Sequence, residues 1–126
     1  MNKLNNRNNE RAKFAYVELK KLTCKKSEFR SLARNFPTLV QANGLTVATA
    51  YLYSNPDKAH HKALDDIIVK WLKECEYNIK NDRELMQFVA NSENERLQCL
   101  TVEVMALLVW IKRIAEGMFN DNESIK

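Results

Sequence analysis

The chain has 126 residues, a length that suits one domain and can bury a core without metal ions or disulfides. Hydrophobic residues make up 45% of it and charged residues 29%, and only two glycines and two prolines occur, which excludes disordered and turn-rich all-β proteins. The formal net charge of +4 is unevenly placed, because residues 1–34 hold ten Lys or Arg against three acidic residues, whereas the remainder carries a net −3.

The first predicted elements are a flexible start and a basic helix. Residues 1–9 include five asparagines and almost no apolar side chains, so burial cannot offset the entropy of ordering them. From about Asn9 to Leu22, apolar residues recur at helical spacing, and lysines gather near the end, where cations suit the helix dipole. A second helix begins at Ser27, and its buried face consists of Phe29, Leu32, Ala33 and Phe36.

Pro37 and the pair Asn43-Gly44 interrupt the apolar pattern that follows. Pro37 lacks a backbone donor and crowds the preceding turn, so either a kinked helix or a fresh start at this residue fits the sequence. Asn43-Gly44 predicts a helix end, with Gly44 in the left-handed conformation. A further helix then begins at Leu45, and the bend leaves Gln41 and Asn43 near a concave junction.

Three more helices are predicted in the second half. One starts after Asp57, a short one covers residues 85–89, and the last runs from about Leu97 to Met118. Around residues 104–111 the last helix is apolar on nearly all sides, which predicts the central and most buried helix. The tryptophans lie in apolar stripes, so we expect both in the core: Trp71 and Trp110.

The predicted fold is an all-α, compact single-domain bundle of about five to six helices. The helical domain is expected to cover residues 10–119, between the flexible start at 1–9 and a polar, flexible end at 120–126.

Residue types that carry catalysis are sparse and poorly spaced. His60 and His61 are adjacent, so on a helix they point about 100° apart and cannot jointly bind one metal ion. His61 and Asp65 are four residues apart, but an exposed helical pair is a simpler interpretation than a catalytic dyad. Cys24 precedes two lysines that could lower its pKa, yet no histidine is near in sequence.

The three cysteines favour a reducing compartment. Cys24, Cys75 and Cys99 are widely spaced and form no C-x-x-C pair, which argues against a disulfide framework or a zinc site. No N-terminal apolar stretch resembles a signal peptide, and the longest apolar run is too short to span a membrane. We therefore expect a cytoplasmic protein with no metal, no cofactor, no membrane contact and no small-molecule substrate.

The basic residues favour a polyanionic or acidic partner, although a solvated basic helix is the simpler alternative. Arg30 and Arg34 are four residues apart, so they share a side of their helix and lie away from its apolar face. Neither has an acidic residue one turn earlier, which leaves like charges unneutralised within that helix. Lys112 and Arg113 fit equally well with a functional role or with the preference of cations for the last helical turns.

Two stretches resemble a known family. Residues 31–45, SLARNFPTLVQANGL, and residues 96–117, RLQCLTVEVMALLVWIKRIAEG, are similar to the small helical subunit of the type III-B CRISPR (Cmr) RNA-silencing complex. A shorter likeness runs from Arg11 to Tyr16. The matching positions are Arg30, Leu32, Ala33, Arg34, Pro37, Leu39, Val40, Gln41, Asn43, Gly44 and Leu45, then Arg96, Thr101, Glu103, Trp110, Lys112 and Arg113. Thr46-Val47 and Val104 depart from the small residues usual there.

The resemblance implies a non-catalytic subunit of a ribonucleoprotein filament. Such subunits stack in a minor filament against the backbone subunits and help to line the groove that holds crRNA and target RNA. The implied partners are the other Cmr subunits, copies of this chain, crRNA and target RNA. The candidate RNA or subunit contacts are Lys25, Lys26, Arg30, Arg34, Gln41, Lys112 and Arg113, and the candidate structural residues are Pro37, Asn43, Gly44, Trp71 and Trp110.

Two other classes of function remain open from the residues. One is a helical protein–protein adaptor with no RNA role, in which the bend holds a partner helix. The other is a small hydrolase that uses Cys24 or His61.

Overall fold

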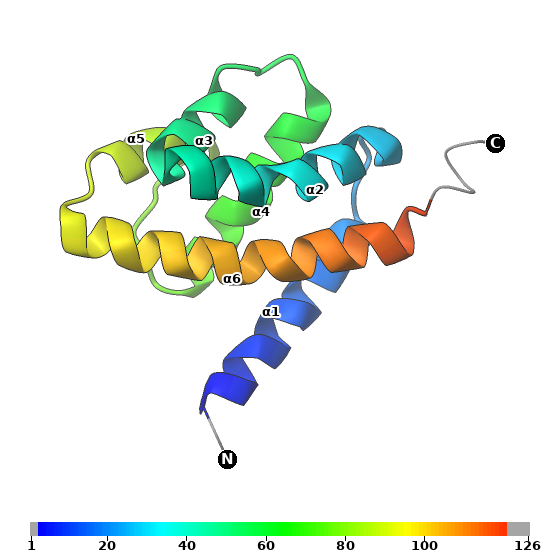
Figure 1. The fold of residues 1–126 in the computed structure, drawn as a ribbon, viewed down its shortest axis with the longest axis horizontal. Coiled ribbons are helices and arrows are strands. Elements are labelled where there is room, and N and C mark those ends of the chain that lie inside the picture. Colours follow the sequence, from blue (N-terminus) through cyan, green and yellow to red (C-terminus); the bar gives the residue numbers. More distant parts are fainter. Residues whose placement is uncertain (1–2, 121–126) are drawn as a thin grey trace.

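In the computed structural model, the described part of the chain is residues 3–120, with the side chains of residues 3–6 and 82 left aside. This part is made of helices and contains no strand (Figure 1). In chain order the elements are α1 (Lys3–Lys20), α2 (Lys26–Asn43), α3 (Leu45–Tyr53), α4 (Ala59–Glu74), the 3-10 turn η1 (Asp82–Glu84), α5 (Leu85–Ala90) and α6 (Asn94–Met118). The all-α bundle predicted from the sequence is confirmed.

The longest helix, α6, organises the bundle. It crosses the molecule with α1 and α2 packed against it, and α3 lies against α2, α4 and α5 (Figure 1). One stripe of α6 is buried, because its apolar residues recur at helical spacing: Leu100, Val104, Leu107, Leu108, Ile111 and Ala115. The predicted central helix is thus in place, but it is covered along one stripe only, since Val109 within the stretch 104–111 is 45% exposed and Val102 just before it is 70% exposed.

The two tryptophans have different environments. Trp71 on α4 is 3% exposed, as predicted, and its ring lies 5.0 Å from that of Phe14 on α1. Trp110 on α6 packs against the core from its margin and is only partly buried. The prediction of a core tryptophan therefore needs correction at Trp110, because α6 turns that position toward the edge of its contact with the rest of the bundle.

The first and last helices fix the boundaries of the helical region. Helix α1 begins at Lys3 rather than near Asn9, so most of the segment 1–9 is helical. At the other end α6 stops at Met118, and Phe119 folds back into the core. Of the end predicted to be flexible, 120–126, only Asn120 belongs to the described part, and residues 121–126 lie outside it.

The turn between α2 and α3 depends on Gly44 alone. Helix α2 continues through Pro37, which therefore neither starts a new helix nor sets the angle between two helices. The buried residues on both sides of it, Phe36 and Val40, hold the helix together despite the missing donor. Gly44 has φ 90° and ψ 162°; the positive φ was predicted, but the ψ lies outside the left-handed helical region.

Gly44 also connects the two helices by hydrogen bonds. Its N–H donates to the carbonyl of Val40 at 2.8 Å and ends α2, while its own carbonyl accepts from Ala48 at 3.1 Å and begins α3. Asn43 is the last residue of α2 and is exposed. One residue therefore caps two helices, which is the reason that the bend can be so short.

Candidate functional site

Arg34 was predicted to present an unneutralised charge, and the structure corrects this. Its Nε lies 3.4 Å from Oε2 of Glu116 on α6, and both side chains are partly exposed to solvent. The two residues are 82 positions apart, so no local pattern in α2 indicates the pair. An exposed ion pair of this kind contributes little to stability, and the guanidinium can exchange it for another anion at small cost.

Arg30 and Gln41 lie on the same helix in different surroundings. Gln41 is exposed near the end of α2, as expected for a surface residue. Arg30 is partly buried and borders a cavity of about 490 Å³ between α2 and the ends of α3 and α4. Its Nε has no access to solvent. The sequence places Arg30 and Arg34 on one face, but only Arg34 is plainly on the surface.

The two lysines at the start of α2, Lys25 and Lys26, have different surroundings. Lys25 is the N-cap residue and is exposed. Lys26 donates from Nζ to the carbonyl of Leu22 at 2.7 Å and to that of Cys24 at 3.1 Å. These carbonyls belong to the loop after α1, so the Lys26 ammonium holds that loop to the start of α2.

The second predicted basic pair lies on α6. Arg113 is exposed and Lys112 is partly buried. Both are on the helix that also carries Glu116, the partner of Arg34. The candidate contact residues are therefore spread over the start, middle and end of α2 and the last turns of α6, and no single cavity in the described part of the chain brings them together.

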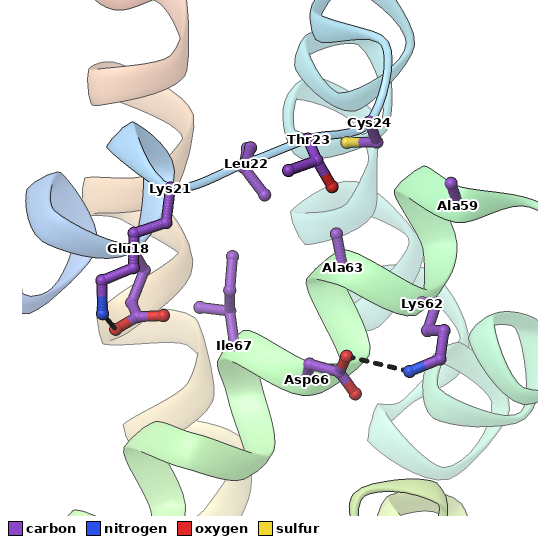
Figure 2. Close-up of a pocket in the computed structure, with 10 residues that line it drawn as sticks. All are labelled: Glu18, Lys21, Leu22, Thr23, Cys24, Ala59, Lys62, Ala63, Asp66 and Ile67. Atoms are coloured by element: carbon purple, nitrogen blue, oxygen red, sulfur yellow. Dashed lines mark hydrogen bonds and ion pairs between the residues drawn. The ribbon is translucent and has the colours of Figure 1, made fainter.

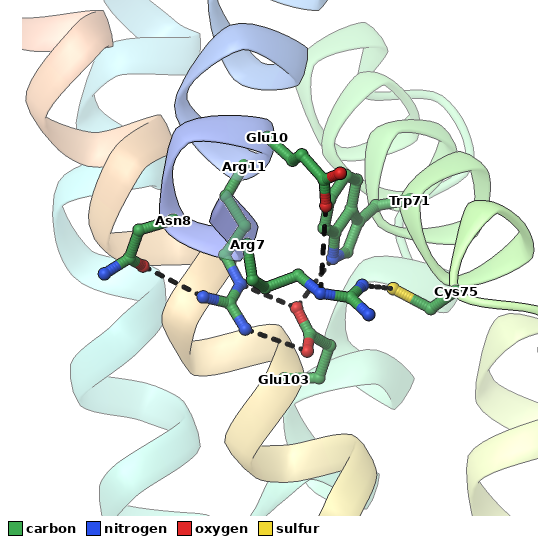
Figure 3. A network of polar contacts seen from close by, with 7 residues as sticks. All are labelled: Arg7, Asn8, Glu10, Arg11, Trp71, Cys75 and Glu103. Atoms are coloured by element: carbon green, nitrogen blue, oxygen red, sulfur yellow. Dashed lines mark hydrogen bonds and ion pairs between the residues drawn. The ribbon is translucent and has the colours of Figure 1, made fainter. Parts of the chain in front are cut away.

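A polar network joins α1, α4 and α6 (Figure 3). Glu103 on α6 accepts hydrogen bonds from Nε and Nη2 of Arg11 on α1, at 2.8 and 3.0 Å. The same carboxylate accepts from Nε1 of Trp71 on α4 at 2.8 Å. Arg11 also donates to Asn8 at 2.9 Å, and Arg7 donates to the Cys75 sulfur at 3.2 Å.

The network favours the ionised forms of Glu103 and Arg11. Burial alone raises the pKa of Glu103, but the hydrogen bonds from Arg11 and Trp71 and the charges of Arg11 and Arg7 outweigh it, so the net pKa is lowered. The hydrogen bond to Glu103 raises the pKa of Arg11. A carboxylate that stays ionised has no proton to donate as a general acid, and its lowered pKa makes it a weak base. Because its oxygens already accept hydrogen bonds from Arg11 and Trp71, we interpret the network as structural.

Cys24 borders a small cavity at the other end of α1 (Figure 2). The cavity is about 350 Å³ and lies between the α1–α2 loop and α4. The described residues around it include no histidine, and its charged groups pair with one another, Lys21 with Glu18 at 3.4 Å and Lys62 with Asp66 at 3.2 Å. Burial raises the pKa of the Cys24 thiol, which disfavours the thiolate that a nucleophile needs.

His61 and Asp65 were predicted to form an exposed helical pair, and this is wrong, since both are buried. The His61 ring packs against the rings of Tyr51 and His60, with centroids 4.8 and 4.6 Å away. Burial lowers the pKa of His61, and the positive charges of His60 and Lys58 lower it further. Within the described part of the chain, Nδ1 of His61 has no hydrogen-bond partner, so no carboxylate holds the ring through that nitrogen as in a catalytic dyad.

Two further kinds of feature are absent from the described residues. No group of three or more His, Cys, Asp or Glu is arranged to hold a metal ion. None of the described helices is long and apolar enough to cross a membrane.

The sequence pattern missed the Arg11–Glu103–Trp71 network as a structural unit. Its members are separated by up to 92 residues, and each looks like an ordinary polar or aromatic helical position by itself. The one available signal was the family likeness, which included Arg11 and Glu103 without giving either a role.

Comparisons with known proteins agree with one another. A family model described as CRISPR-associated protein (Cas_Cmr5) matches residues 7–118. A relative from Thermus thermophilus, named CRISPR system Cmr subunit Cmr5, is 31% identical over 96 residues, which cover 76% of this chain and 79% of the relative. The crystal structure of a CRISPR-associated Cmr5 family protein from the same organism superposes with a TM-score of 0.73 at 29% identity, covering 88% of this chain and 96% of that one.

Proposed function

The chain belongs to the Cas_Cmr5 family of CRISPR-associated proteins, and on this premise we propose that it is a non-catalytic subunit of a type III-B CRISPR (Cmr) ribonucleoprotein complex. In this proposal it forms the minor filament, lies against the backbone subunits and copies of itself, and helps to line the groove for crRNA and target RNA. It acts in the cytoplasm in defence against viruses.

The family match over residues 7–118 carries the proposal, because it includes both the basic start of the chain and the whole of α6. The geometry supports a non-catalytic role. Burial favours the protonated thiol of Cys24, the ring of His61 is packed against Tyr51 and His60, and the carboxylate of Glu103 is bonded to Arg11 and Trp71. A scaffold that binds by surface charge needs no enclosed site.

The exposure and the intramolecular partners of the candidate contact residues indicate which of them can reach RNA or another subunit. Lys25, Gln41 and Arg113 are exposed and suit contact with RNA or a neighbouring subunit. Arg34 can contribute by exchanging Glu116 for a phosphate or an acidic side chain. Lys26 acts within the chain through its loop carbonyls, and Arg30 and Lys112 support the surface from partly buried positions.

Reconstitution of the Cmr complex with and without this chain tests the proposal. Target-RNA affinity is titrated at several salt concentrations, and cleavage is followed in the same samples. We expect omission of the chain to weaken target binding and to flatten its salt dependence, because released counterions scale with the phosphates neutralised. We expect target cleavage at a saturating concentration of the complex to persist without the chain, because other subunits supply the catalytic groups. Unchanged affinity and salt slope without the chain would refute the RNA-lining role.

A second candidate function is a helical adaptor that contacts only protein. The exposed valines of α6, Val102 and Val109, favour it, because they lie two turns apart on the solvent side of that helix. An adaptor predicts that the chain is required for assembly, while the RNA affinity of assembled complexes keeps its salt slope. The same titration therefore separates the two functions.

A further inference from the structure

The outward side of α1 carries a strip of polar and aromatic residues. Asn9, Lys13, Tyr16 and Lys20 are all exposed and recur at helical spacing of three and four residues, so they lie along one face. The opposite face of α1 holds Phe14, Ala15 and Leu19 in the core. The strip therefore faces away from the core, and its two lysines are two helical turns apart, about 10 Å along the axis. At the edge of the strip, Lys13 also lines a cavity with Trp71 and Glu74 of α4.

The acidic residues of α1 do not neutralise this strip. Glu18 pairs with Lys21 at 3.4 Å and with Lys70 on α4 at 3.1 Å. Glu10 lies 3.9 Å from Arg7. Lys13 and Lys20 form no ion pair with any of the described residues. Both lysines are exposed and stand outside these ion pairs.

Tyr16 adds an aromatic surface between the lysines. Its side chain is 49% exposed, and the Lys20 ammonium lies 5.6 Å from the centre of its ring. A tyrosine half in water leaves apolar area unburied, and an amine over part of the ring sets a positive charge beside it. Aromatic rings flanked by amines are the arrangement on which the bases of a single strand stack while the phosphates are neutralised.

We propose that this strip on α1 contacts single-stranded RNA, with Lys13 and Lys20 at phosphates and Tyr16 against a base. Asn9 supplies an amide that can hydrogen-bond a phosphate or a 2′-hydroxyl. The inference rests on the proposed function and locates part of the groove lining on α1 rather than on α2. An acidic protein surface is the other possible occupant, but lysine is depleted in protein interfaces, whereas unpaired lysines beside an aromatic ring are favoured with RNA.

The test uses complexes reconstituted with two variants of this chain, Lys13→Gln/Lys20→Gln and Tyr16→Leu. A charge-matched control, Lys73→Gln/Lys80→Gln, changes two lysines that are exposed elsewhere. Thermal melts first establish that each variant folds, and incorporation into the complex is quantified. Target-RNA affinity is then titrated at several salt concentrations, alongside complexes that lack the chain.

In the lysine variant we expect the slope of log affinity against log salt to be less steep by about 1.4, since each of two single-strand phosphate contacts contributes about 0.7 to its magnitude. Tyr16→Leu should weaken binding about tenfold with the slope unchanged, because it removes stacking but no charge. The control should match the wild type. Affinity and slope equal to the control in both variants would overturn the inference while leaving the proposed function intact.

Two other outcomes also refute the inference. If the variants incorporate poorly but assembled complexes bind RNA normally, the strip docks protein instead. If complexes that lack the chain bind RNA as well as complete ones, the proposed function fails, and this inference fails with it.

Discussion

Removal of the Glu103 carboxylate should destabilise the protein by loosening α1 from α6. In Glu103→Ala, Arg11 loses both of its acceptors on that carboxylate and the Trp71 indole N–H loses its acceptor. Breaking a buried pair by removing one partner costs about 3–5 kcal/mol. The side chains of Arg11 and Glu103 are 14% and 18% exposed, so some water reaches the orphaned guanidinium, and we expect about 3 kcal/mol.

Glu103→Gln separates the charge from the hydrogen bonds. A glutamine oxygen can still accept from Trp71, so in an Arg11→Met background this change should cost little. In the wild-type background it leaves Arg11 without its counter-charge. Urea unfolding of the wild type, both single variants and the double variant should therefore give a coupling energy of about 1–2 kcal/mol.

The coupling should also depend on pH. The folded pKa of Glu103 is lowered, so the unfolded chain binds this proton first, and the stability from the pair is present above the ordinary glutamate pKa of about 4.3. It is lost as pH falls through the folded pKa. The stability gap between wild type and Glu103→Gln should close on acidification. A coupling energy of zero, or a gap that stays constant from about pH 7 to pH 3, would refute the reasoning.

Four further changes test the fold. Gly44→Ala should cost about 1–2 kcal/mol in thermal melts, through its φ of 90° alone, since no atom lies within 4 Å of the new Cβ; a neutral result would contradict the strain. Pro37→Ala should raise stability by about 1 kcal/mol in the same assay, because it restores a donor inside α2; a loss would contradict this. In urea unfolding, Trp71→Ala should cost about 3–5 kcal/mol and the partly buried Trp110→Ala only about 2, so equal losses would contradict their different burial. Burial lowers the folded pKa of His61, so stability falls as pH drops below about 6.5, and His61→Phe should weaken that dependence in melts at two pH values; an unchanged dependence would show that another group carries it.

The spacing of apolar residues and the position of Gly44 were sufficient to predict the helices and their order along the chain. The apolar spacing of α2, α4 and α6 indicates which faces are buried, and Gly44 marks a helix end because few other residues adopt positive φ. Pro37 could not be interpreted from the sequence alone, since its cost in a helix is local and the burial of Phe36 and Val40 that offsets it is tertiary.

The surroundings of the candidate site residues were harder to predict than the helices. A charged side chain pairs with groups that are near in space, and these can be distant in sequence. Arg34 has no acidic neighbour in its own helix, yet Glu116 reaches it from α6. Lys26 looks like surface charge until its carbonyl acceptors are known. Trp110 fits an apolar stripe, but the orientation of α6 decides how much of it is covered. Sequence therefore indicates which residues are charged or apolar, and the packing of helices decides which of them remain available.

The pairing of α1 with α6 has a consequence for synthesis. The first helix packs mainly on the last, and Arg11 meets Glu103 only after 92 further residues have been made. While the chain emerges from the ribosome, Phe14, Ala15 and Leu19 thus lack their principal cover until α6 is released. Long-range closure of this kind slows folding and leaves apolar surface open to chaperones. Nascent chains stalled before α6 should therefore remain sensitive to protease over α1, whereas the completed protein should protect it.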